Sequence, residues 1–245
     1  MQTAAVHECP TEQLHIWADV LAQAVTGELI GASNYETLAG LFEDKEEKAE
    51  AIEHAQGERG HAGSFTQAGK SIGCEVQVNL EAQYWKRIRS SFVARAQAGD
   101  LIDCIIAQEV MLESFAVASY QVVAKSAPGI LGPTFARIAG EEEEHVAHAI
   151  ALLKAERDRD APEFDAKVHR MHEEVMTTLA EMISKQDTRG HCGLCQGNCV
   201  KPSLPAAGVN LSEIRGASLQ RYLKTLDEIG VPGEASLAWV AKLPV

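Results

Sequence analysis

The sequence predicts an all-α protein built as a helix bundle, and three observations support this prediction. No proline occurs between Pro10 and Pro128, which favours long helices because proline is excluded from helix interiors. Alanine, the strongest helix former, is the commonest residue of the chain. Apolar side chains recur at helical spacing, for example at Leu219, Leu223 and Leu226.

The expected helices follow one another between clear breaking signals. Glu43–Asp44 marks a turn between the first two helices, and Gly99-Asp100 separates the third from the fourth. The fifth follows Gly132-Pro133, and the sixth follows Pro162. The expected ranges are 12–41, 46–70, 78–98, 100–124, 134–156, 163–187, 211–229 and 234–243.

Residues 187–210 differ from the rest of the chain. They hold glycines, prolines and three cysteines with little periodicity, so they are expected to form a long Cys-rich loop inserted between two helices. The whole chain, 1–245, is expected to be a single helical domain, because its 245 residues suffice for one large buried core.

Charge and hydropathy exclude several classes of function. The formal net charge of −13 argues against a nucleic-acid partner, which needs a cationic surface. No membrane span is expected, since the most apolar stretch, 101–124, carries Asp103, Glu109 and Glu113. His7 and Glu8 lie where a secretory signal would need basic and apolar residues, so a cytoplasmic location is expected.

Two Glu-x-x-His motifs lie within expected helices, at Glu58–His61 and Glu142–His145. A spacing of three residues returns both side chains to one helix face, where carboxylate and imidazole can share a metal ion. A two-metal bundle site also needs one glutamate from each of two further helices. A third copy of the motif, at Glu12–His15, shows that the pattern alone is weak evidence.

Register within the helix pairs selects the two further glutamates. In an antiparallel pair, residues equidistant from the turn face each other. Glu28 and Glu58 are nearly equidistant from Glu43–Asp44, and Glu113 and Glu142 are equidistant from 127–128. Both pairs lie about 22 Å from their turns, at about 1.5 Å per residue. The third motif pairs with a glycine-rich break and is rejected.

Glu113 is the most informative of these residues. It lies among apolar neighbours such as Val110, Met111 and Phe115, where an unpaired carboxylate would be costly to bury. A metal ion is one of the few partners that favours such burial. The expected di-metal ligands are Glu28, Glu58, His61, Glu113, Glu142 and His145. Carboxylate and imidazole ligands suit two irons, and they also accept manganese.

Several stretches around these residues resemble the cyanobacterial aldehyde-deformylating oxygenase family, also called fatty aldehyde decarbonylases. The matching segments are Gly27-Glu28 with Asn34-Tyr35, Glu58 to His61 leading into Phe65 and Gly69-Lys70, Glu113 to Tyr120, Glu142 to His145 leading into Leu153-Lys154-Ala155, and Leu226 to Gly230. The spacing from Glu58 to Glu113 to Glu142 also matches the ligand order of that family.

The resemblance implies a ferritin-like four-helix bundle with additional helices, in which the six residues bind two irons and Tyr120 lies near them. It also implies O2 activation with electrons from a ferredoxin-type donor. The implied substrate is an aldehyde or another small, largely apolar molecule, and an aldehyde would be cleaved to formate and a hydrocarbon one carbon shorter.

Three features depart from the family. Ala68 stands where the family has a cysteine. Gly57, Gly60 and Gly63 form a stripe that indicates close helix packing or, alternatively, extra room or a π-bulge beside the metals. Glu109 lies one α-helical turn before Glu113 and is an additional ligand, a proton donor in catalysis, or part of a polar path to solvent.

The Cys-rich loop offers a possible second metal or redox site at His191, Cys192, Cys195 and Cys199. One imidazole and three thiols suit zinc, with an iron–sulfur cluster or a redox dithiol as alternatives. Seven further ionisable residues of the helices are expected to be solvated: Glu141, Glu143, Glu144, His54, His148, His169 and His172.

Three alternatives to the deformylating oxygenase stay open. A di-iron hydroxylase or N-oxygenase would keep the metals and change the substrate. A ferritin-like or rubrerythrin-like protein would bind iron and scavenge peroxide. A purely structural bundle would bind no stoichiometric iron.

Overall fold

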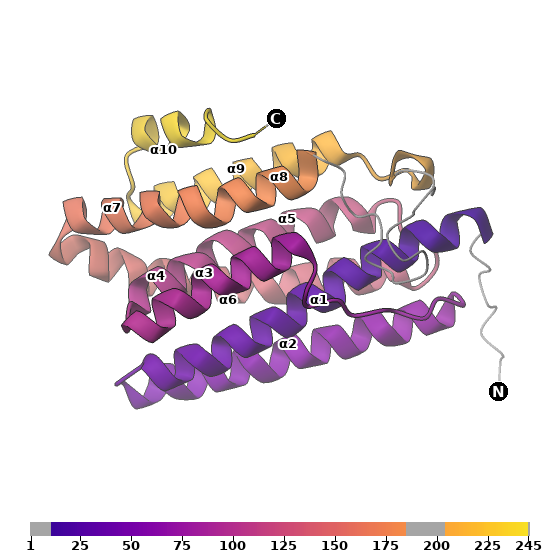
Figure 1. The fold of residues 1–245 in the computed structure, drawn as a ribbon, viewed down its shortest axis with the longest axis horizontal. Coiled ribbons are helices and arrows are strands. Elements are labelled where there is room, and N and C mark those ends of the chain that lie inside the picture. The colour runs from indigo at the N-terminus through magenta and orange to yellow at the C-terminus, as the bar shows by residue number, and fades with distance from the viewer. Residues whose placement is uncertain (1–10, 185–203, 245) are drawn as a thin grey trace.

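A computed structural model describes residues 11–184 and 204–244, and within these ranges it contains helices and no strand (Figure 1). The α-helices are α1 (Thr11–Leu41), α2 (Lys45–Ser71), α3 (Gln83–Ala98), α4 (Leu101–Ile105), α5 (Glu113–Ala124), α6 (Leu131–Arg159), α7 (Ala161–Met171), α8 (Thr177–Ser184), α9 (Leu211–Ile229) and α10 (Gly233–Val240). Two π-helices, η1 (Ile106–Leu112) and η2 (His172–Met176), and a short 3₁₀-helix, η3 (Leu204–Ala207), interrupt this series. The prediction of an all-α fold is confirmed.

Four long elements form the central bundle. α1 packs along α2, the continuous rod α4–η1–α5 packs along α6, and α2 also contacts α6. α9 packs against α5 and α6, whereas α3 packs against α1 and α4 (Figure 1). The bundle therefore brings its two helix hairpins face to face, as the sequence pattern requires.

Local capping explains where the helices begin and end. The Asp44 carboxylate accepts hydrogen bonds from the backbone N–H groups of Glu46 and Glu47 at 2.8 and 3.1 Å, which starts α2 at the expected turn. Asn210 caps α9 in the same way, and Gly230 ends it with a φ of 100°, a conformation that glycine adopts without strain.

The third helix begins later than expected, at Gln83 instead of residue 78. Asn79 explains the difference, because its backbone N–H donates to Thr26 Oγ1 at 3.2 Å and its side chain accepts from the N–H of Glu81 at 3.2 Å. These bonds hold 79–81 in a turn that competes with helix formation.

The glycine stripe of α2 forms neither a close packing contact nor a π-bulge, and the expected extra room beside the metals stays a prediction. α2 is a regular α-helix from Lys45 to Ser71, so the π-bulge prediction is wrong for this helix. A Cβ atom at Gly57, Gly60 or Gly63 would meet nothing within 4 Å, so the close-packing interpretation is also wrong. The π-helix lies instead in η1, directly before Glu113.

Gly57 and Gly63 have room for a methyl side chain, so alanine should stabilise the helix at these positions. The double variant Gly57→Ala/Gly63→Ala should raise the free energy of unfolding by about 1–2 kcal/mol, because each alanine favours the helix by up to about 1 kcal/mol. Chemical denaturation monitored by circular dichroism measures this change. A destabilised variant would show that the stripe packs against something.

Two hydrophobic cores lie on either side of the middle of the bundle. One includes Leu38, Ala51, Val110 and Leu153, and the other includes Leu21, with Phe65, Tyr120 and Phe135 on the facing helices. The predicted metal ligands lie along the helices between these two sets. A polar level is therefore enclosed by apolar layers.

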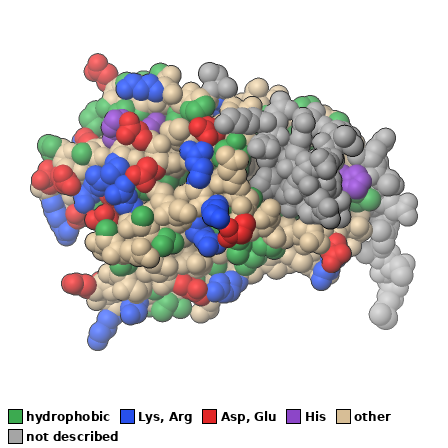
Figure 2. Space-filling model, viewed as in Figure 1, with side chains coloured by type: hydrophobic (Ala, Val, Ile, Leu, Met, Phe, Trp, Pro, Cys, Tyr) green, Lys and Arg blue, Asp and Glu red, His purple; other side chains and the backbone are tan. Residues whose placement is uncertain are grey.

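The surface shown in Figure 2 carries acidic and basic side chains interspersed with one another, without a continuous basic patch on its described part. None of the described helices combines the length and the apolar character needed to cross a membrane.

Candidate metal centre

The six predicted ligands are all buried and come from the four central elements: Glu28 from α1, Glu58 and His61 from α2, Glu113 from α5, and Glu142 and His145 from α6. Their burial is nearly complete, and Glu142 has no exposed surface. The structure brings all six together. It excludes the third motif, since His15 is exposed.

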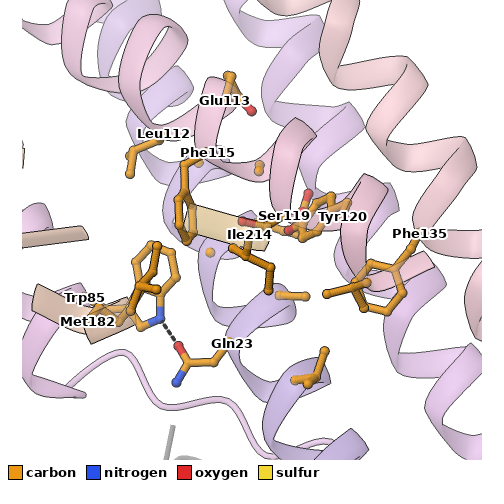
Figure 3. Close-up of a pocket in the computed structure, with 18 of the residues that line it drawn as sticks. Gln23, Trp85, Leu112, Glu113, Phe115, Ser119, Tyr120, Phe135, Met182 and Ile214 are labelled. Atoms are coloured by element: carbon orange, nitrogen blue, oxygen red, sulfur yellow. Dashed lines mark hydrogen bonds between the residues drawn. The ribbon is translucent and has the colours of Figure 1, made fainter. Parts of the chain in front are cut away.

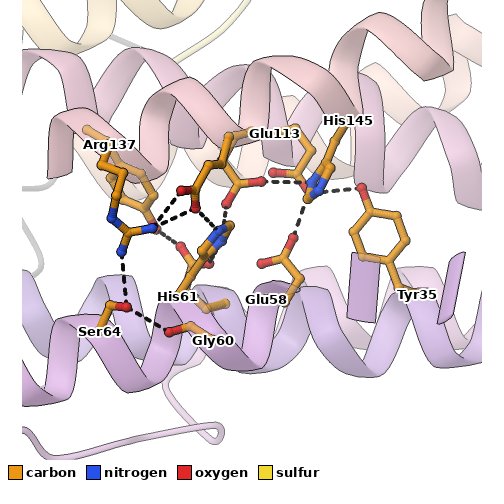
Figure 4. Close-up of polar contacts among 12 residues, drawn as sticks. Tyr35, Glu58, Gly60, His61, Ser64, Glu113, Arg137 and His145 are labelled. Atoms are coloured by element: carbon orange, nitrogen blue, oxygen red, sulfur yellow. Dashed lines mark hydrogen bonds and ion pairs between the residues drawn. The ribbon is translucent and has the colours of Figure 1, made fainter. Parts of the chain in front are cut away.

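The six residues form two overlapping groups of four (Figure 4). Glu28 and His61 belong to one group, Glu113 and His145 belong to the other, and Glu58 and Glu142 belong to both. Within each group the potential ligand atoms lie within 4.8 Å of one another. Two cation positions that share two carboxylates are the arrangement of a di-metal centre.

Glu142 connects the two groups directly. Its Oε1 lies 2.8 Å from His61 Nδ1, and its Oε2 lies 2.8 Å from His145 Nδ1. Yet both oxygens of Glu142, together with His145 Nδ1 and Glu58 Oε1, are buried without a hydrogen bond of adequate geometry. Converging polar atoms that are buried and unbonded carry a large desolvation cost. Divalent cations placed between them would remove it, so the residues present fit a di-metal centre.

The carboxylates set the protonation of the two histidines. Burial alone would lower the pKa of His61, but the adjacent carboxylates of Glu142 and Glu28 raise it to about 11. Burial would also lower the pKa of His145, but the carboxylates of Glu113 and Glu142 outweigh this effect and raise it to about 10. Both imidazoles are therefore positively charged at neutral pH in the metal-free protein, with a proton on each ring nitrogen. Metal binding must displace the proton from the nitrogen that becomes a ligand.

Mutual repulsion acts on the carboxylates in turn. Burial, followed by the charges of Glu113, Glu142 and Glu28, raises the pKa of Glu58 well above its ordinary value. The pKa of Glu113 is lowered instead: burial would raise it, but His145, Gln108 and Tyr35 stabilise the anion more strongly. Without cations, the four carboxyl groups of the centre cannot all be ionised, because they repel one another.

Hydrogen-bond donors hold the terminal glutamates in place. The Tyr120 hydroxyl donates to Glu28 Oε1 and so lies beside this group of potential ligands. On the other side, Gln108 Nε2 and the Tyr35 hydroxyl donate to Glu113 Oε1 at 2.8 and 3.2 Å. Tyr35 and Gln108 were not predicted as site residues.

Gly31 is another residue of the site that the sequence did not single out. A Cβ atom here would lie 3.1 Å from the Glu58 carboxylate and 3.3 Å from Gln108 Nε2. Glycine therefore lets α1 approach the shared ligand closely. The sequence feature that could have identified Gly31 is its position one helical turn after Glu28, on the same face of the helix.

The Glu141 side chain is 45% exposed, which agrees with the expected acidic surface, but it also belongs to the site, which was not expected. Its Oε2 lies 2.8 Å from His61 Nε2, and Arg137 binds the same carboxylate at 2.7 Å (Figure 4). A carboxylate on the second ring nitrogen fixes the orientation of a metal-binding histidine and strengthens it as a ligand. Arg137 also donates to Ser64 Oγ, which joins α6 to α2.

Glu109 is buried but lies outside both ligand groups. The π-helix η1 explains this, because its wider turn aligns Gln108, five residues before Glu113, with the metal centre. Glu109 faces His148 instead, with 3.7 Å between Oε2 and Nδ1. The expectation that His54, His148 and His172 are solvated is wrong, since His172 is buried and the other two are largely covered.

An apolar pocket of about 140 Å³ adjoins the centre (Figure 3). Glu28, Glu58 and Glu113 line part of it, and its walls come mainly from α1 and α5, with smaller contributions from η1, α8 and α9 and with Trp85 and Phe135. The Trp85 indole N–H donates to Gln23 Oε1 on one wall. An apolar molecule in this pocket would reach the ligand groups without crossing solvent.

The predicted second site at His191, Cys192, Cys195 and Cys199 lies outside the described residues.

Comparison with known proteins gives two findings. Residues 15–188 match the family model described as long-chain fatty aldehyde decarbonylase. The structure also matches that of "Protein 19 with aldehyde deformylating oxidase activity from Synechococcus", with a TM-score of 0.78 at 16% identity over 98% of each chain. At this identity the match establishes the fold alone, and it confirms the predicted ferritin-like architecture.

Proposed function

Because this chain belongs to the long-chain fatty aldehyde decarbonylase family, we propose that it is an O2-dependent di-iron oxygenase that cleaves an aldehyde. Its products are formate and a hydrocarbon one carbon shorter. The observation that carries the proposal is the direct contact between two buried ligand groups and an apolar pocket.

The six buried residues would hold the metals, with Glu58 and Glu142 shared between them. Carboxylate and imidazole ligands suit both iron and manganese. We propose iron as the metal, with manganese as the alternative. When bound, such a metal pair supplies O2 binding and electron transfer. Tyr120 would keep Glu28 oriented by hydrogen bonding, and the apolar walls would hold the aldehyde and exclude water.

The chemical balance indicates what the protein needs from outside. One aldehyde, one O2, four electrons and four protons give one hydrocarbon, one formic acid and one water. The electrons must come from a reductant, and we propose a ferredoxin-type donor, as the family resemblance implies.

The test is to incubate iron-loaded protein with O2, a reducing system and aldehydes of graded chain length. We expect formate and the shortened hydrocarbon in equal amounts, measured by gas chromatography and a formate assay. If no aldehyde yields formate or a shortened hydrocarbon, the deformylation proposal is overturned. The same protein without iron is the matched control.

The alternatives predict other outcomes. A hydroxylase or N-oxygenase would consume O2 with a different product and no formate. A peroxide scavenger would turn over hydrogen peroxide without organic substrate. The apolar pocket beside the ligands favours an oxygenase over a peroxide scavenger, because peroxide needs no apolar binding site.

A further inference from the structure

The two cation positions of the centre have the same kinds of ligand but different surroundings. Each position has one glutamate and one histidine of its own, and both share the same two glutamates. The His61 position is that of Glu28 and His61, and the His145 position is that of Glu113 and His145. Because the ligand types are identical, a difference in affinity between the positions comes chiefly from the residues that hold the ligands.

The histidine of the His61 position is held at both ring nitrogens. Nδ1 lies 3.1 Å from Glu28 Oε2 inside the centre, and Nε2 lies 2.8 Å from Glu141 Oε2 on the outer side. Arg137 lies 2.7 Å from both oxygens of Glu141 and donates to Ser64 Oγ at 3.0 Å (Figure 4). The outer carboxylate is therefore fixed between α6 and α2, and it holds the ring of His61 with Nδ1 towards the cation.

The histidine of the His145 position is held at one ring nitrogen only. Its Nδ1 lies 2.8 Å from Glu142 Oε2. In the part of the chain that the structure describes, no carboxylate forms a hydrogen bond or an ion pair with Nε2, since all ion pairs of His145 involve Nδ1. The ring instead packs against the ring of His54, with 4.0 Å between the centroids. This imidazole thus lacks the outer carboxylate that orients a ligating histidine.

The glutamates of the two positions differ in the same direction. Glu113 Oε1 accepts two hydrogen bonds, from Gln108 at 2.8 Å and from the Tyr35 hydroxyl at 3.2 Å. Both lone pairs of this oxygen are therefore occupied, and Oε2 alone is left for a cation. Glu28 Oε1 accepts one hydrogen bond, from the Tyr120 hydroxyl, and keeps a lone pair free.

From these differences we propose that the two positions bind cations unequally, with an affinity at the His61 position at least about tenfold higher than at the His145 position. An outer carboxylate on a ligating histidine typically accounts for about 10–100-fold in metal affinity. Glu141 is then a positioning residue, because it acts on the cation through His61. The inference rests on the di-metal centre of the proposed function and does not depend on aldehyde cleavage.

Unequal affinities make the cation of the His145 position the exchangeable one. When metal is scarce, the chain should hold a single cation, at the His61 position. A reaction that needs both metals should then follow the occupancy of the His145 position. The same inequality lets the chain hold two different metals, because the first ion stays bound while the second exchanges.

The test isolates each position, because two neighbouring cations repel each other and would bind in separate steps even at identical positions. It uses metal-free full-length protein and Mn²⁺ as the probe, with stoichiometry and Kd measured by equilibrium dialysis and metal analysis. Glu113→Gln should retain one ion at the His61 position, and Glu28→Gln should retain one at the His145 position. We expect the Kd of Glu113→Gln to be at least about tenfold lower than that of Glu28→Gln.

The role of Glu141 is tested in the same two variants. Adding Glu141→Gln to Glu113→Gln should raise its Kd about 10–100-fold, whereas adding it to Glu28→Gln should leave the Kd unchanged. A merely structural role of Glu141 would raise both Kd values together. The matched control Glu144→Gln removes the same charge from an exposed position of α6 and should change neither Kd.

Equal Kd values in Glu113→Gln and Glu28→Gln, or a lower Kd in Glu28→Gln, would overturn the unequal affinities and leave the proposed function standing. Loss of both ions from Glu113→Gln would also overturn them, because the His61 position would then bind no cation on its own. An unchanged Kd after adding Glu141→Gln to Glu113→Gln would overturn the role of Glu141. If wild type binds no Mn²⁺, the di-metal centre of the proposed function fails together with this inference.

Discussion

Replacing Glu58 by glutamine should abolish binding of both central metals and yet stabilise the metal-free protein. Glu58 belongs to both ligand groups, so its loss removes one ligand from each cation. In the metal-free protein its pKa is raised well above the ordinary value by burial and by three neighbouring carboxylates. Glutamine resembles the protonated carboxyl group, and it is neutral at pH 7 without having to bind a proton.

The sign of the stability change depends on pH. A carboxyl group whose pKa is raised by folding destabilises the fold above its unfolded pKa, where the unfolded chain ionises freely. Glu58→Gln should therefore raise the stability of the metal-free protein at pH 7 by at least about 1 kcal/mol, or roughly 2–4 °C in Tm. The gain should vanish near pH 4, where the unfolded chain is itself protonated.

Metal analysis and thermal unfolding with and without iron measure both effects. Glu53→Gln, an exposed position on the same helix, should leave metal content unchanged. Retention of two ions by Glu58→Gln, or a lower Tm of its metal-free form, would contradict the assignment of Glu58 as a buried shared ligand.

Filling the apolar pocket should abolish aldehyde turnover without removing the metals. Ala116 lines the pocket on α5, three residues after Glu113. A phenylalanine here would occupy much of a cavity of about 140 Å³. Because displacement by about 1 Å can cost 100-fold in rate, we expect Ala116→Phe to lower kcat/KM at least about 100-fold.

The measurement combines steady-state kinetics, iron content and circular dichroism. Ala94→Phe makes the same substitution at an exposed position of α3, outside the pocket, and should keep full activity. Normal turnover of long aldehydes by Ala116→Phe would show that the substrate binds elsewhere. A loss of iron would show that the pocket supports the centre instead of the substrate.

Much of the fold and of the candidate centre could be predicted because both depend on local periodicity. The range 211–229 is helical as expected, and α1 and α2 differ from expectation by one residue at each changed end. The candidate ligands follow from two spacings: three residues along a helix, and equal distances from the turn of an antiparallel pair. Both are properties of regular α-helices.

The sequence alone determined the all-α fold, the two facing hairpins and the six buried ligand candidates, since these require only the α-helical repeat. Tertiary structure decided which neighbours serve them. η1 departs from the α-helical repeat, so Gln108 reaches Glu113 while Glu109 turns to His148. The contact between Glu141 and His61, and the close approach of Glu58 to Gly31, arise only because separate helices pack closely. These contacts depend on helix rotation and separation, which packing sets and local sequence patterns do not encode.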